Sequence, residues 1–169
     1  MQTMRKELFF CDTVTLSNFV LSDSLNLLVS RYGTRLVLTN EVLDEIAGGI
    51  VAGYPELAQI EGVLKNGGLG QTALTAKEWK TKLECLRTLG SGESSCIACA
   101  LHRKGTVITD DRAARKCCDG WKIPFTGTVG ILMAASRNGN IDATMADLIL
   151  RRMVDRGFYS PVRNIASLL

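Results

Sequence analysis

Acidic side chains stand where strand-like segments of this sequence end. Asp12 closes the apolar run ELFFCD (residues 7–12), and Asp110 and Asp111 close TVITDD (residues 106–111). Ligand sites of open parallel α/β sheets lie beyond the carboxyl ends of the strands. We therefore expect these three carboxylates to lie at one edge of a sheet.

Two more acids come from helices that adjoin strand-like segments. Glu93 opens a helical stretch after the glycine turn GSG, and Glu45 lies in the helix after RLVLT (residues 35–39). Carboxylates packed together repel one another, so one must take up a proton or a cation must neutralise them. Oxygen ligands without histidine or thiolate suit Mg²⁺ or Mn²⁺, which activate water and stabilise charge on a phosphoryl group. The acids thus predict metal-dependent attack of water on a phosphodiester.

The thiol and imidazole side chains favour a structural role. Cys96 and Cys99 form a CxxC pair that, with Cys117 and Cys118, offers four thiolates for zinc, but both pairs lie in helical patterns without a glycine knuckle. We expect the cysteines to be small buried residues. The single histidine, His102, has no evident partner, which disfavours a histidine triad or a zinc hydrolase.

Predicted strands and helices alternate along the chain. The strands are expected at residues 7–12, 35–39, 71–75, 106–111 and 122–125. The helices are expected at residues 23–32, 41–49, 55–65, 76–87, a stretch after GSG that stops at Gly105, 112–118, a stretch that ends at Asn138 or Gly139, and two C-terminal segments. Strands joined through helices pair in parallel, in a sheet covered on both faces.

Glycine, proline and polar residues give three local expectations. TVTLSN (residues 13–18) is predicted to be a polar turn, and Gly48 and Gly49 are predicted to end the helix that holds Glu45. Ser160 and Pro161 stand in the order of an N-cap and a first helical residue, which predicts a final helix.

The composition is that of a globular domain. Of 169 residues, 46% are apolar and 22% are charged, and the net charge of +3 permits a nucleic-acid partner without requiring one. No apolar run approaches the roughly 20 residues of a membrane helix, and the N-terminus lacks the pattern of a signal peptide. We therefore expect one cytoplasmic domain over residues 1–169 without a membrane partner, with a core at about 7–138 and a helical C-terminal extension at about 141–169.

Four motifs together resemble the PIN domain, in particular a prokaryotic subfamily with an extended C-terminal helical tail. They are CDTVTLSNF, LTNEVLDEI, LGSGESSCIACAL, and VITDDRAAR with IPFTGTVGIL. Each is weak alone, but their order and spacing from about residue 8 to residue 160 make the match fairly specific. The resemblance implies a three-layer α/β/α sandwich with a mainly parallel central sheet and C-terminal helices.

The resemblance also implies an activity and partners. Most characterised PIN domains are metal-dependent ribonucleases, and many are toxins held inactive by a small cognate antitoxin. The expected protein is therefore an endoribonuclease that cuts single-stranded RNA with Mg²⁺ or Mn²⁺. Its expected partners are the RNA substrate, a small antitoxin and a second copy of the chain.

Residue roles follow from the same resemblance. Asp12 would be the central metal ligand, Thr13 the hydroxyl that orients the acidic cluster, and Asn18 the polar residue a turn later. Val14 departs from the family, which commonly has a small polar residue there, and Glu93 is longer than the aspartate of many relatives. The remaining acids would be Glu45, Glu93 and Asp111, with Asp110 nearby and Asp111 favoured over it as the fourth ligand.

Every one of these residues has a structural alternative. Asp12, Asp110 and Asp111 can cap helices, Glu93 can sit in a first helical turn, and Glu45 can be an exposed helix residue. The basic residues that follow the aspartates either guide a phosphate backbone or are solvated charges, and they are Arg112, Arg115 and Lys116.

Other protein classes fit less well. In a receiver domain the acidic pair comes at the first strand, and here it comes late. A dinucleotide binder needs its glycines after a strand, and GSGESS follows a helix. The serious alternative is a non-catalytic PIN-like module that binds nucleic acid or a protein.

Overall fold

The computed structural model describes residues 6–169 and contains a five-stranded sheet in the order β3-β2-β1-β4-β5, in which every neighbouring pair is parallel. The central strand is β1, where Phe10 lies opposite Val37 and Val107 of its two neighbours. The strands are β1 (Phe9–Cys11), β2 (Leu36–Thr39), β3 (Gly70–Thr72), β4 (Thr106–Ile108) and β5 (Phe125–Thr126).

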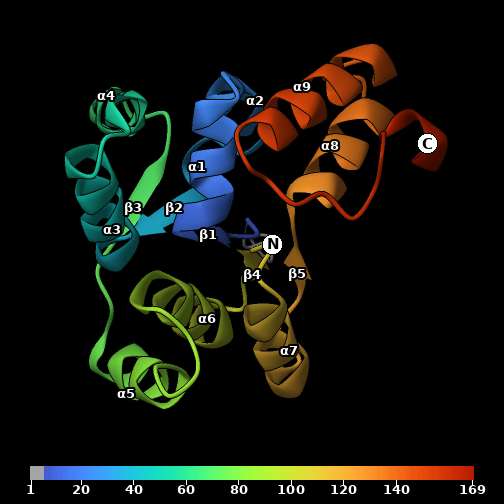
Figure 1. The fold of residues 1–169 in the computed structure, drawn as a ribbon. Coiled ribbons are helices and arrows are strands. Elements are labelled where there is room, and N and C mark those ends of the chain that lie inside the picture. Colours follow the sequence, from blue (N-terminus) through green and yellow to red (C-terminus); the bar gives the residue numbers. More distant parts are fainter. Residues whose placement is uncertain (1–5) are drawn as a thin grey trace, which may run out of the picture.

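Helices connect the strands and cover the sheet. The α-helices are α1 (Thr13–Leu21), α2 (Leu25–Tyr32), α3 (Asn40–Val51), α4 (Gln59–Lys65), α5 (Ala76–Cys85), α6 (Ser91–Arg103), α7 (Arg112–Trp121), α8 (Thr128–Arg137) and α9 (Ala143–Asp155). Short 3-10 turns occupy Gly33–Arg35, Pro55–Ala58 and Ala166–Leu168. Helices α1, α2, α8 and α9 lie on one face of the sheet, and α5, α6 and α7 lie on the other (Figure 1). The predicted α/β sandwich with a parallel sheet is confirmed.

The core lies on both faces of the sheet. Phe10 and Leu38 of the strands have 0% exposure, as do Phe19 of α1, Ile97 of α6 and Leu132 of α8. Burying one such side chain contributes about 1.5–3 kcal/mol, so a shift of strand register would be costly. This packing fixes where each strand ends, and with it the positions of the polar residues that follow.

Residues 13–18, predicted as a polar turn, instead form the first part of α1. Asp12 caps this helix, and Leu16 and Phe19 bury one of its faces. The prediction was wrong because an N-cap aspartate followed by apolar residues at helical spacing indicates a helix, and those two signals outweigh the polar composition.

Helix α3 continues through Gly48 and Gly49 and ends at Val51, so the prediction that these glycines end it was wrong. Neither has a positive φ, and the chain turns only at Gly53, where φ is 112°. A glycine ends a helix when the backbone needs the left-handed region, and these two positions do not need it.

No α-helix begins at Ser160 and Pro161. The hydroxyl of Ser160 instead accepts the N–H of Val162 at 3.2 Å and donates to its carbonyl at 2.7 Å, which closes a local turn. We call residues 157–169 the C-terminal tail. The prediction of a final helix was wrong because a serine side chain that satisfies nearby backbone groups competes with a helix.

The two edge strands are short. β3 covers three residues and β5 covers two, and both differ from the predicted 71–75 and 122–125. Lys122 takes a left-handed φ of 57° at the end of α7, so β5 begins only after it.

Buried charges hold α5 against its neighbours. Glu78 accepts hydrogen bonds from Arg103 at 2.6 and 2.8 Å and from the N–H of Thr75 at 2.7 Å. Burial alone would raise the pKa of Glu78, but these hydrogen bonds outweigh it and lower the pKa to about 2. Glu78 is therefore a structural carboxylate that stays ionised.

Candidate active site

Asp12 follows β1 directly and has 1% exposure. Its Oδ1 accepts the N–H of Thr15 at 2.7 Å and so caps α1, while its Oδ2 is buried without a hydrogen-bond partner among residues 6–169. Burial is the main cause that raises the pKa of Asp12, contacts with Thr109 and Thr15 lower it in part, and the charge of Asp110 adds to the rise. A buried carboxylate oxygen without a partner is costly, which indicates a place for a proton or a cation.

Glu45 reaches from α3 to the beginnings of two other helices. Its Oε1 accepts the N–H of Gly92 at 2.8 Å, and its Oε2 accepts the hydroxyl of Thr13. A glutamate held by two elements is more than an ordinary exposed helix residue. The hydroxyl of Thr13 thus contacts an acid, and its role in orienting the acidic cluster stays a prediction.

Glu93 lies in the first turn of α6, where its Oε2 accepts the N–H of Gly90 at 3.2 Å. Burial is the main cause that raises the pKa of Glu93, and the charges of Asp111, Asp12 and Glu45 raise it further. Glu93 therefore stabilises the start of α6, which is the structural alternative given for it above. It also lies close enough to three other carboxylates for their charges to raise its pKa.

Asp110 is saturated with hydrogen bonds. Its Oδ1 accepts the N–H of Thr128 at 2.9 Å and a guanidinium N–H of Arg115 at 3.2 Å. Its Oδ2 accepts the hydroxyl of Thr128 at 2.5 Å. Asp110 therefore ties the end of β4 to the start of α8.

Asp111 differs from its neighbour. Its Oδ1 accepts the N–H of Ala114 at 2.7 Å and caps α7, but within the described residues its Oδ2 makes no hydrogen bond. The geometry thus leaves a carboxylate oxygen of Asp111 available to a cation, and it leaves none on Asp110.

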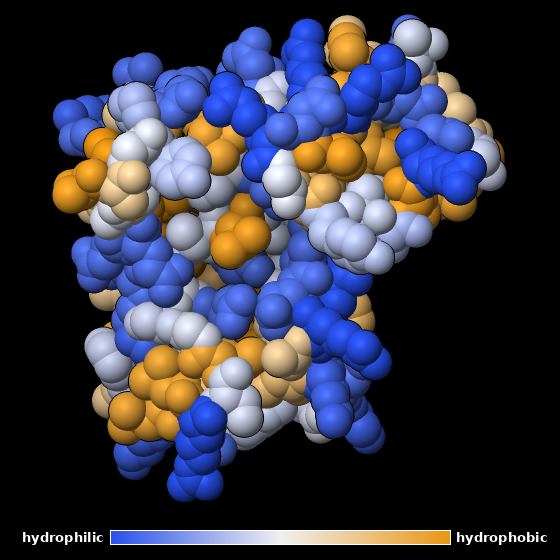
Figure 2. All heavy atoms as spheres, in the orientation of Figure 1, coloured by the Kyte–Doolittle hydropathy of each residue, from blue (hydrophilic) through white to orange (hydrophobic). Residues whose placement is uncertain are grey.

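The structure brings Asp12, Glu45 and Glu93 to one pocket of about 270 Å³, which Thr13 also lines. This part of the surface, between α1 and α6, is mostly hydrophilic (Figure 2). Among residues 6–169, no three acidic, histidine or cysteine side chains lie close enough to form a metal cluster as they stand. The acids thus share a pocket and a field without forming a closed coordination shell.

Two threonines that contact the aspartates were missed in the sequence. Thr15 accepts the N–H of Asp110 at 3.2 Å, and Thr128 donates to the same residue. Thr15 could have been found from its place three residues after Asp12, which is an N-cap aspartate. It was missed because residues 13–18 were predicted to form a turn. Thr128 lies in the fourth motif, but a threonine in a helix start carries no distinctive pattern.

The remaining predicted residues lie apart from the acidic pocket. Asn18 is half-buried on α1, does not line the pocket, and its amide nitrogen has no hydrogen-bond partner within the described part of the chain. Arg112 and Arg115 line a different hollow beside Asp110, and the exposed Lys116 lines neither.

The cysteines are buried as predicted, except that Cys117 is half-buried. The histidine differs from expectation, because the ring Nε2 of His102 lies 2.8 Å from the hydroxyl of Thr81. This contact joins α6 to α5 and is structural.

Comparison with protein families gives a match over residues 8–169, to a family described as the PIN domain. The chain belongs to the PIN domain family. PIN domains are generally nucleases, and PIN nucleases usually use divalent metals. The match includes the C-terminal tail, so the PIN family pattern extends beyond the sheet and its helices. No curated protein matches the chain.

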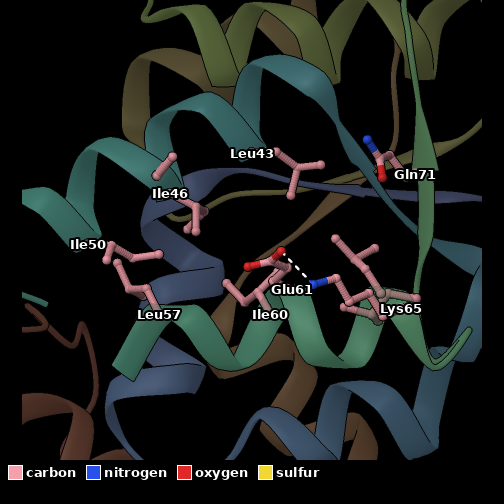
Figure 3. Close-up of a pocket in the computed structure, with 11 residues that line it drawn as sticks. Leu43, Ile46, Ile50, Leu57, Ile60, Glu61, Lys65 and Gln71 are labelled. Carbon is pink, nitrogen blue, oxygen red and sulfur yellow. Dashed lines mark ion pairs between the residues drawn. The ribbon is translucent and has the colours of Figure 1, made fainter. Parts of the chain in front are cut away.

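A third hollow of this PIN domain lies between α3 and α4 (Figure 3), with a volume of about 460 Å³. Aliphatic side chains from both sides point into it, and Lys65 pairs with Glu61 beside them at 2.8 Å. That glutamate is paired, unlike the acids of the acidic pocket, Asp12, Glu45 and Glu93, which form no ion pair among residues 6–169. The labelled aliphatic residues are Leu43, Ile46, Ile50, Leu57 and Ile60.

Within residues 6–169, no helix has the length and apolar character that spanning a membrane requires.

Proposed function

We propose that this PIN domain is a divalent-metal-dependent endoribonuclease that hydrolyses single-stranded RNA. The observation that supports it best is the buried, unpartnered Oδ2 of Asp12 in a pocket shared with Glu45 and Glu93. A protein retains such an uncompensated oxygen where function requires it, because a hydrogen-bonded or apolar residue would be more stable.

The donor set fits Mg²⁺ or Mn²⁺. These hard cations prefer carboxylate oxygens, and Asp12, Glu93 and Asp111 would supply them, while Asp110 is already saturated. A cation there would lower the pKa of a bound water and neutralise charge on the phosphoryl group. Since the acids form no closed cluster as they stand, a cation would have to draw them closer together.

The other residues of the pocket hold the acids in place. Glu45 receives hydrogen bonds from Thr13 and Gly92, which fix its position in the pocket, where it would accept a proton from the attacking water. The raised pKa values of Asp12 and Glu93 mean that the folded protein disfavours their ionised forms. A nearby cation would stabilise those ionised forms.

The test is cleavage of a mixed single-stranded RNA pool with Mg²⁺ or Mn²⁺. Native protein is compared with Asp12→Asn, with an EDTA control, and with Asp119→Asn, which removes an exposed acid of α7 outside the pocket. We expect native protein and Asp119→Asn to cleave, and Asp12→Asn and EDTA to lose at least about 100-fold in rate. Cleavage that survives Asp12→Asn would contradict the proposal.

One observation favours a second candidate. The lack of a closed metal cluster among residues 6–169 also fits a non-catalytic module that binds nucleic acid or protein. Metal binding separates the two, because Mg²⁺ or Mn²⁺ should raise the melting temperature of the native protein but not of Asp12→Asn if the pocket binds a cation. Toxin-like behaviour, an antitoxin partner, homodimerisation and a cytoplasmic location remain predictions.

A further inference from the structure

A hollow of about 700 Å³ lies beside Asp110, and we call it the tail groove. It lies between α7, the start of α8 and the C-terminal tail, and Asp110 forms one of its walls. Its size falls in the range of about 300–1,000 Å³ typical of ligand pockets. The side chains that give it chemical character are Arg112, Arg115, Phe125, Phe158 and Tyr159.

The two arginines give the tail groove a positive wall. Arg115 is held in place, because its Nε donates to the carbonyl of Thr109 at 2.9 Å, its Nη2 bonds to Asp110, and its guanidinium lies 5.7 Å from the ring centre of Phe125. Its Nη1 makes no hydrogen bond within the described residues. Arg112 is exposed and forms no ion pair with any residue of 6–169. Both guanidinium groups thus have donors left for a phosphate.

Two aromatic residues of the C-terminal tail, Phe158 and Tyr159, also line the groove. Tyr159 is 91% exposed, although a tyrosine ring carries a large apolar area that is usually at least partly covered. Its neighbour Phe158 is half-buried, and the Phe158 N–H donates to the carbonyl of Met153 at 3.0 Å. Exposed aromatic rings beside arginines are the combination that binds single-stranded nucleic acid, with rings stacking on bases and cations contacting the backbone.

The tail that carries these rings is well anchored. Gly157 turns the chain at the end of α9 with φ of 101°, and the turn at Ser160 shapes the next residues. Asp147 of α9 accepts the N–H of Ile165 at 2.5 Å, and Ile165 is fully buried. A wall fixed at both ends can bind a ligand without first being ordered.

We propose that the tail groove binds the nucleotides that flank the scissile phosphate of a single-stranded RNA, with Tyr159 stacking on a base and Arg112 and Arg115 facing the sugar–phosphate backbone. This rests on the proposed function in that the RNA is the substrate of the adjacent acids. Asp110 lines the groove and Asp111 follows it in the chain, so we expect a strand bound in the groove to pass close to the acidic residues.

The experiment measures equilibrium binding of a fluorescent single-stranded RNA of about ten nucleotides in EDTA, so that cleavage cannot interfere. Tyr159→Ala should weaken binding about 5- to 150-fold, the loss expected for one base stack. Tyr159→Phe should bind like the native protein. The control Tyr54→Ala removes a tyrosine that is 50% exposed and does not line the groove, and it should also leave binding unchanged.

The arginines have their own paired control. Arg112→Ala should weaken binding and reduce the slope of log K against log salt by about 1, whereas Lys80→Ala, which removes an exposed cation of α5 outside the groove, should change neither. The same binding is then measured with a series of RNAs that each lack one base at a different position. Tyr159→Ala should weaken the binding of every RNA in the series except the one that lacks the base stacked on Tyr159.

The outcomes separate the two proposals. If native protein cleaves RNA and Tyr159→Ala binds as tightly as Tyr54→Ala, the groove proposal fails and the nuclease stands. If Tyr159→Ala weakens binding but native protein never cleaves, the groove stands and the nuclease fails. If Tyr159→Ala leaves RNA binding intact but changes the oligomeric state, the surface contacts a second copy and the groove proposal fails.

Discussion

The backbone N–H of Gly92 donates a 2.8 Å hydrogen bond to Oε1 of Glu45, which joins the first turn of α6 to α3. A Cβ atom added at Gly92 would lie 2.9 Å from the hydroxyl of Thr13 and 3.0 Å from Cδ of Glu45. These atoms cannot all remain in place, so position 92 sets where the glutamate lies. The φ of Gly92 is not positive, so glycine is needed here because of the limited space and not for an unusual backbone conformation.

Gly92→Ala should therefore displace Glu45 and lower RNA cleavage at least about 10-fold, in the range for loss of a residue that supports a metal site. The control is Gly48→Ala, a helical glycine whose added Cβ would meet nothing within 4 Å. That variant should keep full cleavage and gain about 0.5–1 kcal/mol in free energy of unfolding. Equal cleavage rates in the two variants would show that Glu45 does not act in the reaction.

Asp12→Asn should raise the stability of the metal-free protein. The pKa of Asp12 is raised in the folded state from its ordinary 3.8, so folding favours the protonated carboxyl. The native protein thus loses stability as the pH rises from about 4 through the raised pKa, and asparagine does not. Melting temperatures in EDTA should differ little below pH 4 and favour Asp12→Asn above it. A native protein that is more stable than the variant at pH 7 in EDTA would contradict this prediction, because it would mean that the fold favours the ionised carboxylate of Asp12.

Asparagine substitutions at Asp110 and Asp111 should differ in their effects on stability and on RNA cleavage. Asp111→Asn keeps a good N-cap residue, so its free energy of unfolding should change by less than about 0.5 kcal/mol while cleavage falls. Asp110→Asn breaks the charged contacts to Thr128 and Arg115 and should lose about 1–3 kcal/mol. Chemical denaturation and RNA cleavage of both variants measure this. Full cleavage in Asp111→Asn would overturn its place as a ligand.

Glu78 provides a prediction about acid stability. Its pKa of about 2 is below the ordinary 4.5, so its ionised form stabilises the fold above pH 4.5, and this contribution is lost as the pH falls from about 4.5 to about 2. Glu78→Gln should thus be less stable than the native protein at pH 6, and the difference should shrink on acidification. Urea unfolding at several pH values between 6 and 3 tests it. A constant difference would mean that the pKa of Glu78 is not lowered.

The approximate positions of the three central strands were the most predictable feature of this protein. An apolar run that ends in an acid indicates where a parallel strand stops, and Asp12 directly follows β1 as this pattern predicts, whereas Glu45 and Glu93 reach the same pocket from α3 and α6. What these acids do remains a prediction. Their distances depend on side-chain rotamers and on helix packing between segments far apart in the chain, which no local pattern specifies.

Each error has a physical cause, and in two cases the cause is a tertiary contact. Residues 13–18 look polar because a short helix with one buried face needs only a few apolar residues, here Leu16 and Phe19. Ser160 and Pro161 form a helix-start pattern that tertiary contacts override, since Ile165 must be buried and bound to Asp147. The choice between Asp110 and Asp111 could not be made from adjacent identical residues, because only the packing of α8 supplies Thr128 to one of them.

The brevity of β3 and β5 has a consequence for self-association. Exposed strand edges invite pairing with another chain, which leads to sheet extension and aggregation. With three residues on one border and two on the other, the sheet offers an incoming strand too few free backbone groups to hold it. Any assembly of this protein with itself must then form through its helices and loops, and mutations that disrupt it belong on those surfaces.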